Sequence, residues 1–285
     1  MNIEKLHNTL YVSDLDGTLL NEKSVLSSTT ERILQQVLAH GANFTIATAR
    51  TPATVENLMR NVPISLPKIV IAGAVLWHTD SASYSHARVF DESIIKRLCD
   101  IFTRFGINPF VYRLNNNEII ASHAELLSPF ERAFYEPRKK SKYKQMLLSD
   151  TMPFGSKEHQ PILIYVLGEY DTLEKAYNHI LAENLDVFPL CYHDIFDHSK
   201  GNLEIYPKGT SKANSIETIA KELGTKRVVV FGDNLNDLPM MRSATHSVAV
   251  ANAVDEIKDA AHEVIGPNTA DSVARWIAAD LEIEV

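Results

Sequence analysis

The sequence has little cysteine and no long apolar run. Only two cysteines, Cys99 and Cys191, occur among 285 residues, and neither has a neighbour at the spacing of a metal-binding or disulfide motif. A zinc site and a disulfide framework are therefore not expected. No apolar run reaches the roughly 18 residues that a membrane-spanning helix needs. The N-terminus also lacks the basic start and apolar stretch of a signal peptide, so we expect a cytoplasmic protein without a membrane partner.

Basic residues are also fewer than acidic residues. The chain has 28 lysines and arginines against 36 aspartates and glutamates, a formal net charge of −8. This balance argues against a general surface for nucleic acid. Hydrophobic residues make up 45% and charged residues 22%, which is ordinary for a folded globular chain. The length corresponds to about two domains, and the sequence carries no signal for an oligomeric state.

The two ends of the chain alternate between strand-like and helix-like patterns. In the first part we expect strands and helices in alternation at Thr9–Ser13, Ser28–His40, Phe44–Ala47, Pro52–Arg60 and Ile69–Trp77. After residue 207 the alternation returns, with elements expected at Ser211–Leu223, Arg227–Phe231, Leu238–Ser243, Ser247–Ala251, Val254–Ala261, Glu263–Ile265 and Asp271–Leu281. Strand–helix–strand order favours a parallel sheet with right-handed crossovers.

The middle of the chain breaks this alternation. Helices and strands are expected there at Asp91–Phe105, Phe110–Leu114, Glu118–Ser122, Ala124–Phe134, Pro161–Gly168, Thr172–Asn184, Val187–Phe196 and Leu203–Tyr206. Phe110–Leu114 and Glu118–Ser122 flank three asparagines and indicate a hairpin. We therefore predict an α/β fold in which 1–82 and 206–285 form a core with a parallel sheet, and 83–205 form an inserted α+β domain.

Paired aspartates follow the first expected strand. Asp14 and Asp16 are two residues apart on an extended segment and so point to the same side. Ligands of open α/β sheets bind beyond the carboxyl ends of the strands. A second acidic segment, with Asp233 and Asp237, follows another expected strand. Both carboxylates of the first pair, or one side chain and the neighbouring backbone, can therefore face one site. If the two strands are neighbours, as many as four carboxylates converge.

Such a cluster calls for a cation. Two like charges about 4 Å apart repel by roughly 4 kcal/mol at an effective dielectric constant near 20. The cluster would therefore take up protons or bind a positive ion. All the available ligand atoms are hard oxygens, which favours Mg²⁺ over zinc or copper.

Two further polar residues occur at equivalent places. Thr48 lies just past the second expected strand, and Lys212 lies near the start of an expected helix. A hydroxyl, an ammonium group and the free amides of a helix N-terminus together make an anion site. Beside a hard divalent cation, the anion that we expect is phosphate.

These residues resemble the motifs of a known family. Asp14-Leu15-Asp16-Gly17-Thr18-Leu19-Leu20 is similar to the first motif of the haloacid dehalogenase-like hydrolases, and Thr48 and Lys212 match the second and third. Gly232-Asp233-Asn234-Leu235-Asn236-Asp237 resembles the fourth. The long insertion resembles the cap of the Cof-type subclass IIB, the sugar-phosphatase group. The resemblance implies a Rossmann-like core, an inserted cap domain, Mg²⁺ and hydrolysis of small phosphorylated metabolites, with sugar phosphates favoured.

The resemblance also implies roles for single residues. Asp14 would be the nucleophile that forms an aspartyl-phosphate, and Asp16 the general acid and then base. The metal would be held by the Asp14 carboxylate, the Asp16 backbone carbonyl and Asp233. Asn236 and Asp237 would lie in or near the layer around these ligands. The phosphoryl oxygens would be held by the remaining motif residues, Thr48, Ala49 and Lys212.

Two positions depart from the family pattern. Ala49 stands where the family usually has glycine, and Ala72 stands where it often has asparagine. Because of these departures, a degenerate member that only binds a ligand stays open as an alternative to a phosphatase. Two further alternatives also stay open: a phosphomutase or other phosphotransferase of the same fold, and a phospho-accepting signalling module. A mutase would release little free phosphate, and a signalling module would keep a long-lived aspartyl-phosphate.

Overall fold

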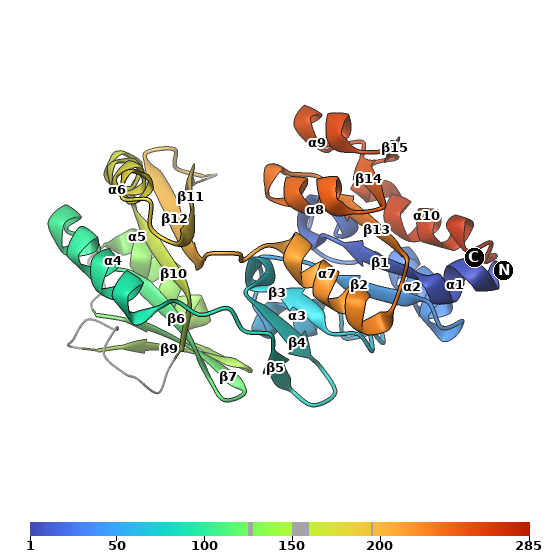
Figure 1. Cartoon of the computed structure of the whole chain (residues 1–285), viewed down its shortest axis with the longest axis horizontal. Coiled ribbons are helices and arrows are strands. Elements are labelled where there is room, and N and C mark those ends of the chain that lie inside the picture. Colours follow the sequence, from blue (N-terminus) through green and yellow to red (C-terminus); the bar gives the residue numbers. More distant parts are fainter. Residues whose placement is uncertain (125–127, 150–159, 195) are drawn as a thin grey trace. The chain divides into compact units, whose positions relative to one another are not determined.

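The computed structural model describes residues 1–124, 128–149, 160–194 and 196–285 (Figure 1). The chain divides into two compact units. Met1–Ser85 and Ser211–Val285 form the first, which we call the core unit, and His86–Thr210 form the second, the cap unit. The two ends of the chain thus meet in one unit, and a continuous middle segment forms the other.

The core unit is built on a parallel sheet of five strands. Their order is β15-β14-β13-β1-β2, and every neighbouring pair is parallel. The strands are β1 (Thr9–Ser13), β2 (Asn43–Ile46), β13 (Arg227–Gly232), β14 (His246–Val250) and β15 (Glu263–Ile265). All five residues of β1 are buried, as expected for a strand with neighbours on both sides. The prediction of an α/β fold with a parallel sheet is confirmed.

Helices lie on both sides of this sheet (Figure 1). They are α1 (Ile3–Asn8), α2 (Ser28–Ala39), α3 (Pro52–Leu58), α7 (Lys212–Leu223), α8 (Leu238–Ser243), α9 (Asp255–Ala260) and α10 (Ser272–Asp280), with short turns η1 (Leu15–Leu19), η4 (Leu235–Asp237) and η5 (Asn268–Ala270). Helix α7 begins at Lys212 because the Ser211 hydroxyl caps it, accepting the Asn214 amide at 3.0 Å. It ends at Gly224, whose φ of 67° is left-handed.

The prediction of a third strand over Ile69–Trp77 is wrong. In its place the structure has β3 (Lys68–Val70), the turn η2 (Ile71–Gly73), β4 (Val75–His78) and β5 (Ser83–Ser85). These three strands form a separate antiparallel sheet. The turn was hidden because Ile71 and Ala72 both have positive φ, a conformation that their residue types rarely adopt.

The cap unit contains a sheet of seven strands in the order β11-β12-β10-β6-β7-β9-β8. They are β6 (Phe110–Asn115), β7 (Glu118–His123), β8 (Lys140–Ser141), β9 (Lys144–Leu148), β10 (Gln160–Glu169), β11 (Val187–His193) and β12 (Lys200–Pro207). All neighbouring pairs are antiparallel except β7 with β9. The predicted hairpin is present as β6 and β7. Strands β8 and β9 were not predicted, because lysine is uncommon in strands.

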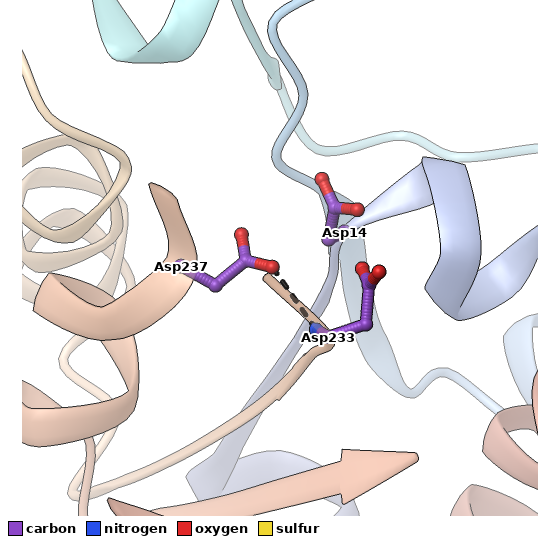
Figure 2. A group of neighbouring side chains, drawn as sticks. All are labelled: Asp14, Asp233 and Asp237. Carbon is purple, nitrogen blue, oxygen red and sulfur yellow. Dashed lines mark hydrogen bonds between the residues drawn. The ribbon is translucent and has the colours of Figure 1, made fainter. Parts of the chain in front are cut away.

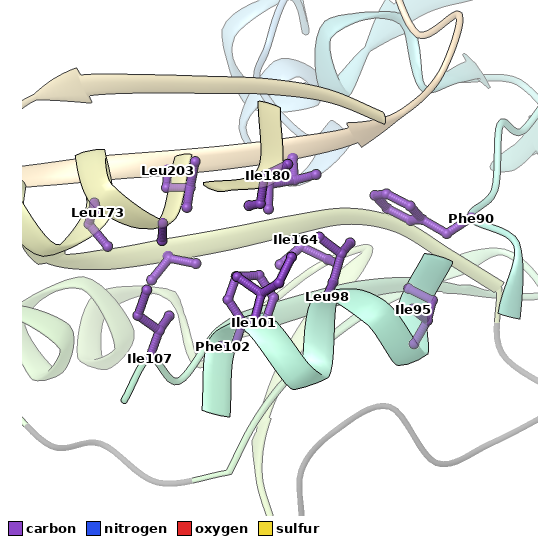
Figure 3. Close-up of a cluster of buried hydrophobic side chains, with 13 residues drawn as sticks. Phe90, Ile95, Leu98, Ile101, Phe102, Ile107, Ile164, Leu173, Ile180 and Leu203 are labelled. Carbon is purple, nitrogen blue, oxygen red and sulfur yellow. The ribbon is translucent and has the colours of Figure 1, made fainter. Parts of the chain in front are cut away.

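Helices α4 (Glu92–Phe105) and α6 (Tyr170–Ala182) cover one face of this sheet and bury the hydrophobic core of the cap unit (Figure 3). The described part of the unit also has the helix α5 (Pro129–Tyr135) and the turn η3 (Glu136–Arg138). Ile95, Leu98 and Phe102 recur at helical spacing along α4 and pack into the cluster. The helix expected near Ala124–Phe134 begins only at Pro129, and residues 125–127 lie outside the described residues.

Among the described residues the longest helix, α4, has 14 residues. None of the helices described is both long enough and apolar enough to cross a membrane.

Candidate active site

The carboxyl ends of β1 and β13 bring three predicted carboxylates together. Asp14 directly follows β1, and Asp233 directly follows β13, the strand that pairs with β1 along its length. One ligand oxygen from each of Asp14, Asp233 and Asp237 lies within 4.8 Å of the others (Figure 2). The convergence that the sequence predicted for neighbouring strands therefore occurs in this structure.

Lys212 belongs to the same buried cluster. Its Nζ donates a hydrogen bond to Asp14 Oδ1 and another, of 2.6 Å, to Asp237 Oδ1. The side chains of Lys212, Asp14 and Asp237 are only 2%, 8% and 0% exposed. With Asp233, the ionised cluster holds three negative charges and one positive charge. Two negative charges are therefore left without a positive partner.

The pKa values of two of these carboxyl groups are raised. Burial raises the pKa of Asp14 above the ordinary range of aspartate, although Lys212 acts against the shift. Burial also raises the pKa of Asp233, to about 6, while a hydrogen bond from Thr18 opposes this. The ionised forms are costly in this environment because their solvation is lost. A divalent cation would restore the balance.

Both carboxylate oxygens of Asp237 already accept hydrogen bonds from the protein. Its Oδ1 accepts Lys212, and its Oδ2 accepts the backbone amides of Asp233 and Asn234 at 3.1 and 3.2 Å. In the described part of the chain, no hydrogen bond reaches Asp14 Oδ2 or Asp233 Oδ2. Asp14 and Asp233 therefore fit direct metal ligands, and Asp237 fits a role in holding the loop and the lysine. Carboxylate oxygens alone suit Mg²⁺.

Two residues of the first motif shape the surroundings of Asp233. Thr18 Oγ1 donates to Asp233 Oδ1 at 2.7 Å. Gly17 has a φ of +79°, and a Cβ atom there would lie 2.2 Å from Asp233 Oδ2. Only glycine fits this position, for both reasons. The sequence offered no sign of the Thr18–Asp233 contact, which joins residues 215 positions apart.

The Asp16 side chain is not part of this group of three carboxylates. Its side chain is 49% exposed and forms an ion pair with Arg50. Arg50 Nε and Nη2 donate to its two carboxylate oxygens at 2.7 and 2.6 Å. Sequence reasoning did not predict Arg50 as a site residue. The feature of the sequence that could have indicated it is its position two residues after Thr48, in the segment that follows β2.

The other predicted residues follow β2 and β13, the two strands that flank β1. Thr48 is buried just after β2, the strand beside β1, and its hydroxyl accepts the amide of Arg50 at 3.1 Å. Ala49 is exposed, so its methyl group is not enclosed by described residues. Asn236 is also exposed, within η4, whereas Asp237 beside it is buried.

Comparisons with known proteins identify the family. A family model described as haloacid dehalogenase-like hydrolase matches residues 11–277. The 5-amino-6-(5-phospho-D-ribitylamino)uracil phosphatase YitU of Bacillus subtilis is 23% identical over 273 residues, covering 94% of this chain and 96% of the relative. The pyridoxal phosphate phosphatase YbhA of Escherichia coli is 25% identical over 281 residues, covering 94% and 97%.

A solved structure shares the fold of this chain. That of a subclass IIB sugar phosphatase superposes with a TM-score of 0.71 and 20% identity, covering 95% of this chain and 98% of the other. The chain belongs to the haloacid dehalogenase-like hydrolase family. The predictions of the Cof-type group and of an enzyme of the phosphatase class are confirmed.

Proposed function

We propose that this protein is a Mg²⁺-dependent phosphatase that hydrolyses small phosphorylated metabolites, sugar phosphates above all, through an aspartyl-phosphate on Asp14. The observation that carries the proposal is the buried cluster in which Lys212 bonds to Asp14 and Asp237 beside Asp233. The relatives named above act on phosphate esters of a ribitylaminouracil, of pyridoxal and of sugars. A phosphoryl group on a small organic molecule is common to all three.

Three groups of this chain would hold the metal: the Asp14 carboxylate, the Asp16 backbone carbonyl and the Asp233 carboxylate. Bound there, Mg²⁺ would offset the repulsion between Asp14 and the phosphate and stabilise charge on the phosphoryl oxygens. Asp237 supports the arrangement from outside, because both of its oxygens are taken by protein donors.

The first half of the reaction transfers the phosphoryl group to the enzyme. An oxygen of the Asp14 carboxylate attacks phosphorus, the bond from phosphorus to the ester oxygen breaks, and an acyl phosphate forms. Lys212, Thr48 and the backbone amide of Ala49 hold the phosphoryl oxygens, since positioning and electrostatics dominate phosphoryl transfer. Protonated Asp16 gives its proton to the leaving oxygen.

The second half returns the enzyme to its starting state. Asp16, now ionised, takes a proton from water as the water oxygen attacks phosphorus. The bond from phosphorus to Asp14 breaks, inorganic phosphate leaves, and the Asp14 carboxylate is free again. Because Arg50 holds both oxygens of Asp16 in this structure, Asp16 must separate from Arg50 before it can donate a proton.

The acid role of Asp16 predicts a leaving-group effect. Asp16→Asn should lower kcat/KM for alkyl phosphates by about 10²- to 10⁴-fold, the usual contribution of a general acid or base. Activated aryl phosphates should suffer less, because their leaving oxygens need no proton. Arg50→Met is the control, since it breaks the same ion pair but keeps the carboxyl group. Equal losses on both substrate types in Asp16→Asn would exclude the acid role.

The raised pKa values of Asp14 and Asp233 predict how Mg²⁺ stabilises the protein. Unfolded aspartates ionise near pH 3.9, but the folded Asp233 holds its proton until about pH 6. The metal-free protein should therefore lose stability as pH rises through this window. Mg²⁺ needs ionised ligands, so it should raise Tm more at about pH 7.5 than at about pH 5.

Thermal denaturation with Mg²⁺ and with a chelator at both pH values measures this difference. Asp233→Asn is the matched variant, because it keeps the shape of the side chain and removes its charge. We expect the Mg²⁺-induced rise in Tm to disappear in it. An equal rise at both pH values in the wild-type protein would contradict the assignment of these carboxylates as ligands.

The proposal is tested by phosphate release from a panel of hexose phosphates, nucleotides, flavin mononucleotide and pyridoxal phosphate. We expect release with Mg²⁺, none with chelator, and recovery when Mg²⁺ is restored. Free phosphate in equal amount to the consumed substrate would exclude a mutase. No release from any member by folded protein with Mg²⁺ would refute the proposed function.

A further inference from the structure

The turn η2 contains three successive residues in left-handed conformations. Ile71, Ala72 and Gly73 have φ values of 51°, 54° and 93°. Only glycine adopts such angles readily, and for a β-branched residue such as isoleucine they are a clear outlier. Strained backbone of this kind persists only where its surroundings impose it. The contacts on each side of the turn therefore show what holds it in place.

On one side, η2 is bonded to the loop after β2. The amide of Ile71 donates to the carbonyl of Arg50 at 3.0 Å, and the amide of Ala72 donates to the carbonyl of Thr48 at 2.9 Å. The Ile71 side chain is completely buried. The turn is thus fixed to the segment that carries Thr48.

On the other side, η2 lies against the first turn of α7. A Cβ atom on Gly73 would lie 2.3 Å from the carbonyl oxygen of Ser211 and 3.0 Å from the amide nitrogen of Lys212. Ser215 Oγ, one helical turn further along α7, donates to the Gly73 carbonyl at 3.0 Å. Two contacts therefore fix the start of this helix to the turn.

We propose that η2 is a positioning element that sets the backbone of Lys212 against the loop carrying Thr48, and that Gly73 is its point of contact with α7. The two side chains that would hold the phosphoryl oxygens are thereby kept at a fixed separation. The inference rests on the proposed function, because it concerns phosphoryl binding by those residues. Lys212 has little freedom to compensate for a shift of its backbone, since its Nζ is buried between Asp14 and Asp237.

The test compares Gly73→Ala with Gly224→Ala. Both glycines have left-handed φ, and Gly224 ends the same helix, but a Cβ atom on Gly224 meets nothing within 4 Å. Both substitutions place alanine at a left-handed φ, which costs free energy. Only Gly73→Ala also puts a Cβ atom against the backbone of Ser211 and Lys212. A shift of about 1 Å in a positioned group can cost roughly 10²-fold in rate, so we expect Gly73→Ala to lower kcat/KM by about 10- to 100-fold.

The decisive measurement compares two dissociation constants in each variant, that of inorganic phosphate and that of Mg²⁺. We expect the Kd of phosphate to rise about tenfold or more in Gly73→Ala, while the Kd of Mg²⁺ stays within about twofold, because its ligands follow β1 and β13. Gly224→Ala should match the wild type in both. Equal phosphate affinity in the two variants, or a parallel loss of phosphate and Mg²⁺ affinity in Gly73→Ala, would overturn the inference.

Ser215→Ala decides the matter if Gly73→Ala does not fold. It removes the hydrogen bond to Gly73 without adding volume, and we expect a smaller loss, still confined to phosphate. Unchanged phosphate affinity in this variant would then overturn the inference. Wild-type hydrolysis with Mg²⁺ tests the proposed function separately, since phosphate binding can be compared between variants whether or not the protein turns over a substrate.

Discussion

Asp14→Asn is expected to lower the rate of phosphate release by at least about 10⁴-fold, because a carboxamide is a poor nucleophile and removal of a covalent nucleophile has effects of this size or greater. The fold should survive. Asparagine has nearly the same shape, and the change removes a buried negative charge. Lys212 keeps its hydrogen bond of 2.6 Å to Asp237.

The measurement is steady-state phosphate release with Mg²⁺, together with circular dichroism and Tm of the same preparations. Asp186→Asn is a suitable control, because that aspartate is 67% exposed and pairs only with Lys208 among the described residues. Wild-type rates are expected for the control. Asp14→Asn activity within about tenfold of the wild type would contradict the assignment of the nucleophile.

Lys212→Met is expected to damage both stability and activity. Removing one partner of a buried ion pair typically costs about 3–5 kcal/mol, because the remaining charges stay buried without compensation. Here Asp14 and Asp237 would lose the cation that lies between them. Loss of a preorganised donor to the phosphoryl oxygens should also lower kcat by about 10²-fold or more.

Urea denaturation with and without Mg²⁺ tests the stability effect. Mg²⁺ should recover part of the lost stability, since it offsets the same carboxylates. Lys208→Met provides the contrast: its ion pair with Asp186 has side chains that are 71% and 67% exposed. Such surface pairs contribute about 0–1 kcal/mol. If the two variants proved equally stable, Lys212 would not have the role described for it.

Much of the core could be predicted from local sequence. The strand Thr9–Ser13 is a short apolar run that ends at Asp14, and helix α7 has a serine cap before Lys212 and a glycine after Leu223. Such signals depend only on neighbouring residues. The meeting of Asp14 with Asp233 required one further fact, that β13 lies beside β1, which no local pattern supplies.

The features that escaped prediction depend on contacts between distant segments. The ion pair of Asp16 with Arg50 requires the loops after β1 and β2 to lie together. The turn at Ile71 and Ala72 has no glycine or asparagine at its left-handed positions before Gly73. Lys144 is buried at the start of β9, and its burial depends on the strands around it, which no local pattern identifies.

The central claim is the aspartyl-phosphate on Asp14, and trapping it is the most direct test. The Asp16→Asn variant should retain the nucleophile but lack the base that helps water attack, so the phosphorylated enzyme should accumulate with an aryl phosphate substrate. Quenching during turnover, digestion and mass spectrometry locate the phosphoryl group. We predict a hydroxylamine-sensitive phosphoryl group on the peptide that contains Asp14. Turnover with no phosphorylated protein at times shorter than one catalytic cycle, or a phosphoryl group on another residue, would contradict the mechanism.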